Sequence, residues 1–79
     1  MNTAFLLLAK YQKPRLALKD IADLMSITVE TARNQIYAGR LPIPTYKEGA
    51  NTFADIRDVA EYLDKMREEA REAADRLSK

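Results

Sequence analysis

The sequence contains no cysteine and no histidine, and only two of its 79 residues are glycine. The absence of cysteine excludes disulfide bonds, and the absence of both residue types excludes the usual zinc clusters. The common nucleophile–base pairs of enzymes are missing for the same reason. Two glycines, Gly39 and Gly49, are too few for a glycine-rich phosphate loop. We therefore expect a protein that is not an enzyme and that binds no metal and no other cofactor.

Long apolar runs are also missing. The longest, from Ala4 to Ala9, has six residues, whereas a membrane-spanning helix needs ~20. No basic segment precedes this run and no small-residue cleavage site follows it, as a signal peptide would require. We expect a soluble protein that has no membrane partner and is located in the cytoplasm.

The length of the chain predicts a single domain over residues 1–79. A domain of this size buries only ~60% of its unfolded surface and is marginally stable alone. Disulfides, metals and oligomerisation are the usual supports of small domains. Because the first two are excluded here, self-association is the support that remains.

Charge gives only a weak indication of the partner, since the formal net charge is +1. Its distribution is uneven: residues 1–55 carry seven Lys or Arg against five Asp or Glu, and residues 56–79 carry six against seven. The slight basic excess therefore lies in the first part of the chain, where the pattern below predicts a DNA-binding unit.

Capping residues and apolar spacing predict four helices, over about 3–11, 19–25, 28–38 and 55–77. Two short strands, over 41–46 and 52–54, are expected to form a hairpin. The fold class is thus mainly α with a small β-hairpin. It corresponds to a winged helix-turn-helix with a long C-terminal helix: a helix-turn-helix over about 18–39, a wing over about 41–54 and the last helix over about 55–77.

The helix-turn-helix prediction depends on a few positions. Two helices joined by a turn of three or four residues cross closely, so the first helix needs a small residue at the crossing. Ala22 occupies that position, Ser26 makes the tight turn, and Ile27 is the apolar residue that fills the joint. Gly39 then ends the second helix in the left-handed conformation that this position favours.

The exposed face of the second helix is the predicted DNA-reading surface. Arg33 and Asn34 carry paired hydrogen-bonding groups suited to guanine and adenine edges. The hydroxyl-bearing residues suit phosphates or thymine methyl groups, and the acid suits either cytosine or the helix N-terminus. The predicted contact residues on this helix are Thr28, Glu30, Thr31, Arg33, Asn34 and Tyr37. The alternative is an ordinary solvated helix face.

Four further residues are predicted to contact DNA. Lys47, Asn51 and Thr52 lie near the tip of the expected wing, within reach of a minor groove or the backbone. The alternative for them is a simple surface turn. Arg40 follows the recognition helix, where it contacts a phosphate or pairs with a nearby acid.

The last helix carries a heptad pattern. Its apolar residues alternate in spacing between three and four: Ile56, Val59, Leu63, Met66, Ala70, Ala73 and Leu77. The first of these are expected in the core, whereas the last four form either a self-association surface or an exposed helix face. Phe5 and Leu8 of the first helix are predicted to contribute to the same self-association.

The segment IADLMSITVETARNQIYAGRLPIP, followed by a short wing and DIRDVAEYL, resembles the excisionase-like and MerR-like winged helix-turn-helix family. The beginning, NTAFLLLAKY, is similar to pyocin-activator-like regulators, and the small size and overall plan resemble the Cox proteins of temperate bacteriophages. The Cox resemblance implies a protein on DNA in a bacterial host cell, with a phage integrase as a further partner. It also implies cooperative binding to repeated sites, DNA bending, promotion of prophage excision as a directionality factor, and repression of the lysogenic promoter.

The sequence therefore predicts a sequence-specific binder of double-stranded DNA that self-associates. Two alternatives remain open. One is a protein–protein interaction module, an adaptor or anti-repressor, on the same fold. The other, implied by the pyocin-activator-like beginning, is a transcriptional activator.

Overall fold

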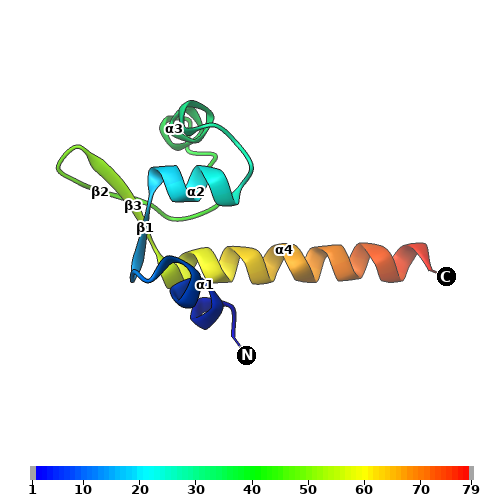
Figure 1. The fold of residues 1–79 in the computed structure, drawn as a ribbon. Helices are drawn as coiled ribbons and strands as arrows, with labels where there is room; N and C mark the ends of the chain where they lie inside the picture. Colours follow the sequence, from blue (N-terminus) through cyan, green and yellow to red (C-terminus); the bar gives the residue numbers. More distant parts are fainter. Residues whose placement is uncertain (1, 79) are drawn as a thin grey trace.

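The computed structural model describes residues 2–78, so the first and last residues of the predicted domain lie outside it. Four helices and three strands make up this part of the chain (Figure 1). They are α1 (Thr3–Tyr11), β1 (Arg15–Ala17), α2 (Leu18–Leu24), α3 (Val29–Tyr37), β2 (Tyr46–Glu48), β3 (Asn51–Asp55) and α4 (Ile56–Leu77). The fold is mainly α-helical with a small antiparallel sheet and a long C-terminal helix, as expected for a winged helix-turn-helix.

Side-chain caps explain where three of the helices begin. Asn2 accepts a hydrogen bond of 2.8 Å from the backbone N–H of the third residue of α1. Thr28 accepts one of 3.0 Å from the third residue of α3, and Asp55 accepts one of 2.8 Å from the second residue of α4. Each cap satisfies an N–H that the first helical turn leaves without a partner, which fixes the helix start in the sequence.

The sheet has the strand order β1-β3-β2. β3 is the central strand and pairs antiparallel with both neighbours, so that Leu16 faces Ala54 on one side and Tyr46 faces Phe53 on the other. The pairing of β1 with β3 was not predicted. Through it, the β2–β3 hairpin that forms the wing is joined directly to the strand that leads into α2.

The strand predicted over residues 41–46 is wrong in its position, because Tyr46 is the only residue of that segment in a strand. Pro42 and Pro44 have no backbone N–H to donate to a neighbouring strand. Ile43, between them, is only 2% exposed and packs in the core. The segment is therefore an anchored connection from α3 to the wing, and β2 begins only after it.

The core draws on α1, β1, α2, β3, α4 and the connection that follows α3. Leu16 of β1, Ile21 of α2, Ile43 of the connection and Val59 of α4 are the largest fully buried side chains. Among residues 2–78 no polar or charged residue is buried with them. Burial of these apolar groups holds the recognition unit, the sheet and α4 together.

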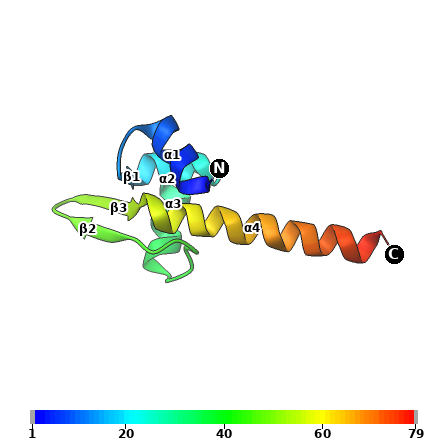
Figure 2. The same ribbon diagram turned by 90° about the horizontal axis from the view of Figure 1, so that it is seen from below.

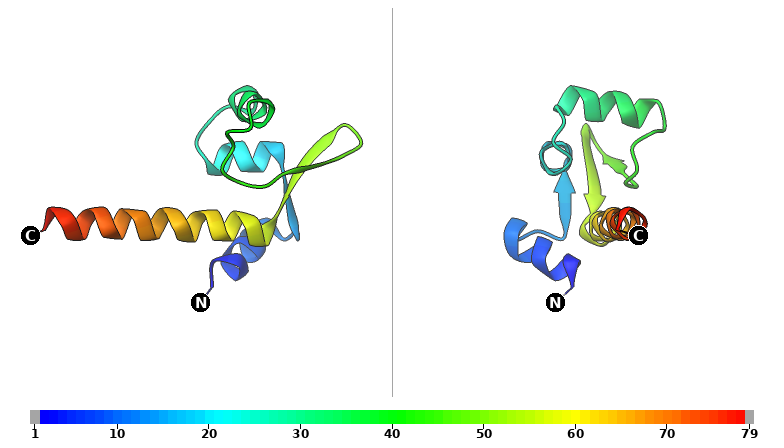
Figure 3. Two further views of the ribbon diagram at one scale, coloured as in Figure 1. Left: turned by 180° about the vertical axis from the view of Figure 1, so that it is seen from behind. Right: turned by 90° about the vertical axis from the view of Figure 1, so that its right-hand side faces the viewer.

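α4 extends well beyond the rest of the molecule. Its first turns contribute Ile56, Val59 and Ala60 to the core and pack against α1. Its C-terminal half projects away from the body (Figures 1 and 2). Although α4 has 22 residues, no helix within residues 2–78 is long and apolar enough to cross a membrane. In a view along α4, α3 and α4 lie at opposite sides of the molecule, with α2 and the sheet at the level between them (Figure 3, right).

Candidate nucleic-acid interface

The joint between α2 and α3 has the geometry predicted for a helix-turn-helix. Ala22 of α2 is 2% exposed and Ala32 of α3 is fully buried. Ser26 adopts a left-handed φ of 59°, and the N–H of Ile27 donates to the carbonyl of Ala22 at 3.0 Å. At the other end of α3, Gly39 has a φ of 68° and terminates the helix as predicted. The sequence therefore places α3 firmly on the body and turns its other face outward.

The outer face of α3 is polar. Arg33 and Asn34 are exposed, and Tyr37 exposes 72% of its surface. The hydroxyl of Thr28 accepts the capping hydrogen bond and donates to the hydroxyl of Thr31 at 2.8 Å. The predicted contact residues of this helix are all exposed: Thr28, Glu30, Thr31, Arg33, Asn34 and Tyr37.

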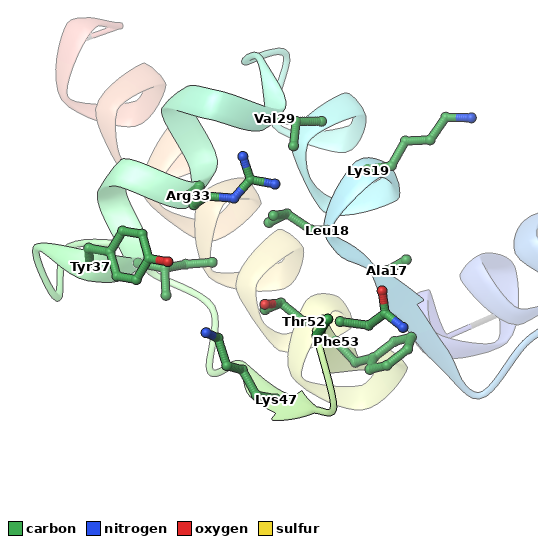
Figure 4. A pocket seen from close by; sticks show the side chains of 12 residues that line it. Ala17, Leu18, Lys19, Val29, Arg33, Tyr37, Lys47, Thr52 and Phe53 are labelled. Carbon is green, nitrogen blue, oxygen red and sulfur yellow. The ribbon is translucent and has the colours of Figure 1, made fainter.

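A groove runs between α3 and the wing. Arg33 and Tyr37 line it from α3, and Lys47, Asn51 and Thr52 line it from the wing. Figure 4 shows Arg33 extending into the groove and Lys47 directed toward Tyr37. The Lys47 ammonium lies 6.0 Å from the centre of the Tyr37 ring, at the outer limit of a cation–π contact. The recognition helix and the wing thus face each other across one concave surface.

Arg15 of β1 connects the wing to the body. Its guanidinium stacks on Phe53, with 3.7 Å between Cζ and the ring centre. It also donates to both oxygens of the Glu48 carboxylate, at 2.7 and 3.3 Å, and to the Tyr46 hydroxyl at 3.4 Å. A bidentate contact of this kind fixes orientation as well as distance. Arg15 therefore spans all three strands.

The Arg15–Glu48 contact also removes an acid from the electrostatics of the wing. The hydrogen bonds from Arg15 lower the pKa of Glu48, and those to Glu48 and Tyr46 raise the pKa of Arg15. Both groups are therefore charged at neutral pH and neutralise each other. Lys47 is left as the uncompensated charge of β2.

Asp55 marks the point where the wing joins α4. Its carboxylate accepts two hydrogen bonds of 2.9 Å from the guanidinium of Arg57, and one of 2.8 Å from the Arg57 backbone N–H. These contacts lower the pKa of Asp55 to about 2. The cap of α4 is therefore an ionised carboxylate at all ordinary pH values.

Four cations around α3 and the wing have no ion-pair partner among residues 2–78. The ion pairs within residues 2–78 are Lys13–Asp20, Arg15–Glu48 and Arg57–Asp55. Four cations near the groove and the end of α3 take part in none of them: Lys19, Arg33, Arg40 and Lys47. Unpaired Lys and Arg on one face are the groups that bind the phosphates of a nucleic acid.

The structure divides the predicted contact residues into two adjoining sets. Lining the groove are Arg33, Tyr37, Lys47, Asn51 and Thr52. Outside it, on the rest of α3 and just beyond its end, are Thr28, Glu30, Thr31, Asn34 and Arg40. For Arg40, the predicted alternative of pairing with a nearby acid is not observed among residues 2–78.

Two residues of this region were not identified from the sequence. Lys19, in the first turn of α2, lines the groove beside α3. Arg15 alternates with the buried Leu16 in β1, and this alternation is the signal that could have placed it on the outer face of a strand. Nothing local, however, indicated that its partner is Glu48, in a strand far away along the chain.

A polar recognition helix on a helix-turn-helix, with a β-hairpin wing beside it, defines a winged helix-turn-helix protein. Residues 3–70 match the family model of the Pyocin activator protein PrtN. The chain therefore belongs to the pyocin activator PrtN family, a phage-associated family of regulators. No curated protein and no solved structure matches the chain significantly. The family match agrees with the resemblance of the N-terminal segment and does not support the narrower assignment to Cox, excisionase or MerR-like proteins.

Proposed function

We propose that this protein is a transcriptional activator that binds a specific sequence in double-stranded DNA. The observation that carries the proposal is the concave surface between α3 and the wing, where the unpaired Arg33 and Lys47 face solvent from opposite sides. α3 enters the major groove, and the tip of the wing approaches the adjacent backbone. The family match supports the activating role.

Within this proposal, base reading and phosphate binding belong to different residues. Arg33 and Asn34 contact base edges, because guanidinium and amide groups form paired hydrogen bonds with guanine and adenine. Lys19, Arg40 and Lys47 neutralise phosphates on the two sides of the recognition helix. Asn51 and Thr52 help to position the wing.

Excision, repression and cooperative binding to repeated sites have a weaker basis. They were implied by the resemblance to Cox proteins, and so was an integrase partner. The family match supports a regulator of the activating kind and offers no support for excision or cooperativity. We therefore propose activation in preference to these roles.

Selection of bound fragments from a random duplex pool tests the DNA-binding proposal. The wild type is compared with an Arg33→Ala/Asn34→Ala variant and with a control, Lys65→Ala, which removes a charge from α4. We expect one enriched motif for the wild type and the control, and its loss in the double variant. Each substitution alone is expected to weaken binding to that motif by about fivefold or more, since a paired base contact contributes ~1–3 kcal/mol.

The rival function, a protein–protein module on the same fold, predicts a different result. Such a module would show no enrichment even at low salt, and binding to any duplex would lack the steep salt dependence of phosphate contacts. The direction of regulation is tested separately, with a reporter gene placed downstream of the selected motif. Activation predicts that expression rises with the wild type and stays at background with the double variant, whereas a fall with the wild type would indicate repression.

A further inference from the structure

The projecting half of α4 leaves an apolar stripe uncovered. The stripe, which we call the α4 stripe, consists of Met66, Ala70, Ala73 and Leu77. It continues, at the same spacing, the positions that Ile56 and Val59 occupy in the core. Met66 is 45% exposed and Leu77 is 86% exposed. An apolar stripe that leaves the core without losing its period is typical of a helix that packs against another helix.

We propose that the α4 stripe is covered by the same stripe of a second copy of this chain, with the two α4 helices antiparallel. The two-fold axis passes midway between residues 70 and 73. In this register, Met66 faces the partner's Leu77, and Ala70 faces the partner's Ala73. Large side chains then meet at both ends, and small ones meet at the centre, where the helices approach closely. The arrangement is self-complementary, as a two-fold interface requires.

The charges beside the stripe favour the same register. Glu69 and Arg76 each precede a stripe residue, and in the antiparallel arrangement Glu69 lies beside Arg76 of the partner subunit. The two-fold axis repeats this contact, so the interface gains two ion pairs. Neither residue has an ion-pair partner within residues 2–78. Parallel helices would instead place Glu69 beside the partner's Ala74, where no ion pair is available.

The body of the protein also disfavours a parallel partner. The stripe lies on the side of α4 on which Val59 enters the core. A parallel second copy would bring its own body to the same end of the helix pair as the body of the first copy, where the two would compete for the same space. The antiparallel arrangement puts the two bodies at opposite ends of the helix pair, because each α4 projects away from its body (Figures 1 and 2).

The interface is short, and this sets the expected strength. Residues 66–77 span about 16 Å at 1.5 Å per residue. A stable interface usually involves about 20 to 30 residues on each side. We therefore expect a weak dimer that forms at high protein concentration. Two sites on one duplex would raise the effective concentration of the stripes and strengthen the contact.

Charge reversal followed by sedimentation equilibrium tests the register. Glu69→Arg and Arg76→Glu are each expected to raise the dimer dissociation constant by about fivefold or more, because each replaces two attractive contacts by two repulsive ones. The double variant restores both ion pairs and is expected to return within about twofold of the wild type. Glu68→Arg is the matched control: it makes the same charge change on the opposite face of α4 and leaves the dissociation constant unchanged. Circular dichroism of all four variants checks that they keep the helix content of the wild type.

Cross-linking provides a second test, which the absence of native cysteine makes unambiguous. Chains with Met66→Cys mixed with chains with Leu77→Cys are expected to form a disulfide between unlike chains. Met66→Cys chains alone are expected to stay uncross-linked, since residues 66 and 77 lie about 16 Å apart along the helix. A parallel pair would cross-link Met66→Cys chains with one another and would not cross-link the unlike chains, and this result would overturn the proposal.

Two further outcomes would overturn the proposal. One is a chain that remains monomeric up to about 1 mM, a concentration at which a dimer with a dissociation constant of about 1 mM would already hold about half of the chains. The other is dimerisation that is insensitive to Glu69→Arg and is abolished by Phe5→Ser/Leu8→Ser. Phe5 and Leu8 are 63% and 44% exposed on α1, so that result would assign the interface to α1 instead.

Discussion

The dependence of DNA affinity on salt follows from the number of unpaired cations at the interface. Lys19, Arg40 and Lys47 are assigned to phosphates, whereas Arg33 is assigned to a base edge. Three phosphate contacts predict that log K falls with log[salt] with a slope of about −2.7 for one bound protomer. Between 50 and 200 mM salt, the affinity should therefore fall about 40-fold. Fluorescence anisotropy with a labelled duplex that carries a single copy of the selected motif measures this slope.

Lys47→Ala tests the contribution of the wing to that slope. Removal of one phosphate contact should reduce the slope to about −1.8, so that the same change in salt lowers the affinity only about 12-fold. Lys65→Ala removes one positive charge from α4, far from α3, and should leave the slope at its wild-type value. If Lys47→Ala leaves the slope unchanged, or if Lys65→Ala reduces it equally, the wing does not contact phosphates and this reasoning is wrong.

Three further predictions concern the supports of the interface. Arg15→Ala leaves the Glu48 carboxylate without its partner, so that it repels DNA phosphates at short range, and should weaken DNA binding by about threefold or more. Addition of Glu48→Gln to this variant should recover most of the lost affinity. An absence of recovery would count against the electrostatic explanation. The Asp55 carboxylate should titrate at about 2 in a carbon-detected NMR titration. Because this pKa is lowered by folding, the stability that Asp55 contributes is present above the ordinary pKa of aspartate and is lost as the pH falls through about 2. Arg57→Ala should raise the midpoint of the Asp55 titration, and an unchanged midpoint would exclude Arg57 as the cause. Ser26→Gly should raise the free energy of unfolding by about 0.5 kcal/mol in urea denaturation, because glycine adopts the φ of 59° without strain but loses more backbone entropy; a lower free energy of unfolding would show that the serine side chain makes a compensating contact.

Local signals were sufficient for the helices and for the division of α3 into a buried and an exposed face. Thr28 is a good N-cap and Gly39 a good C-terminal residue, and both delimit α3 as predicted. Ala32 is buried at the predicted spacing, so the residues between the inward positions had to face outward. A helix carries its own hydrogen bonds, and for that reason its ends and its faces can be predicted from neighbouring residues alone.

The sheet was less predictable because its contacts join distant residues. Ile43 looked like part of an exposed edge strand, but its burial in the core turns its segment into a connection. The strand register that places Arg15 of β1 opposite Asp55 of β3 has no local signature in either strand. The same is true of the stacking of Arg15 on Phe53. The support of the wing was therefore missed, although the wing itself was predicted.

A net charge of +1 looks unfavourable for a DNA-binding protein, and the structure explains why it is a poor guide here. A phosphate is attracted mainly by unpaired charges close to it. Acids that lie farther away than the Debye length of ~8 Å are largely screened by salt. The acid nearest to the wing tip, Glu48, is neutralised by Arg15. α4, which carries seven of the twelve acidic residues, lies at the opposite side of the molecule from α3 (Figure 3). The interface can therefore carry a local excess of positive charge on a chain that is almost neutral, while the acidic and basic residues of α4 remain available for pairing with a second copy.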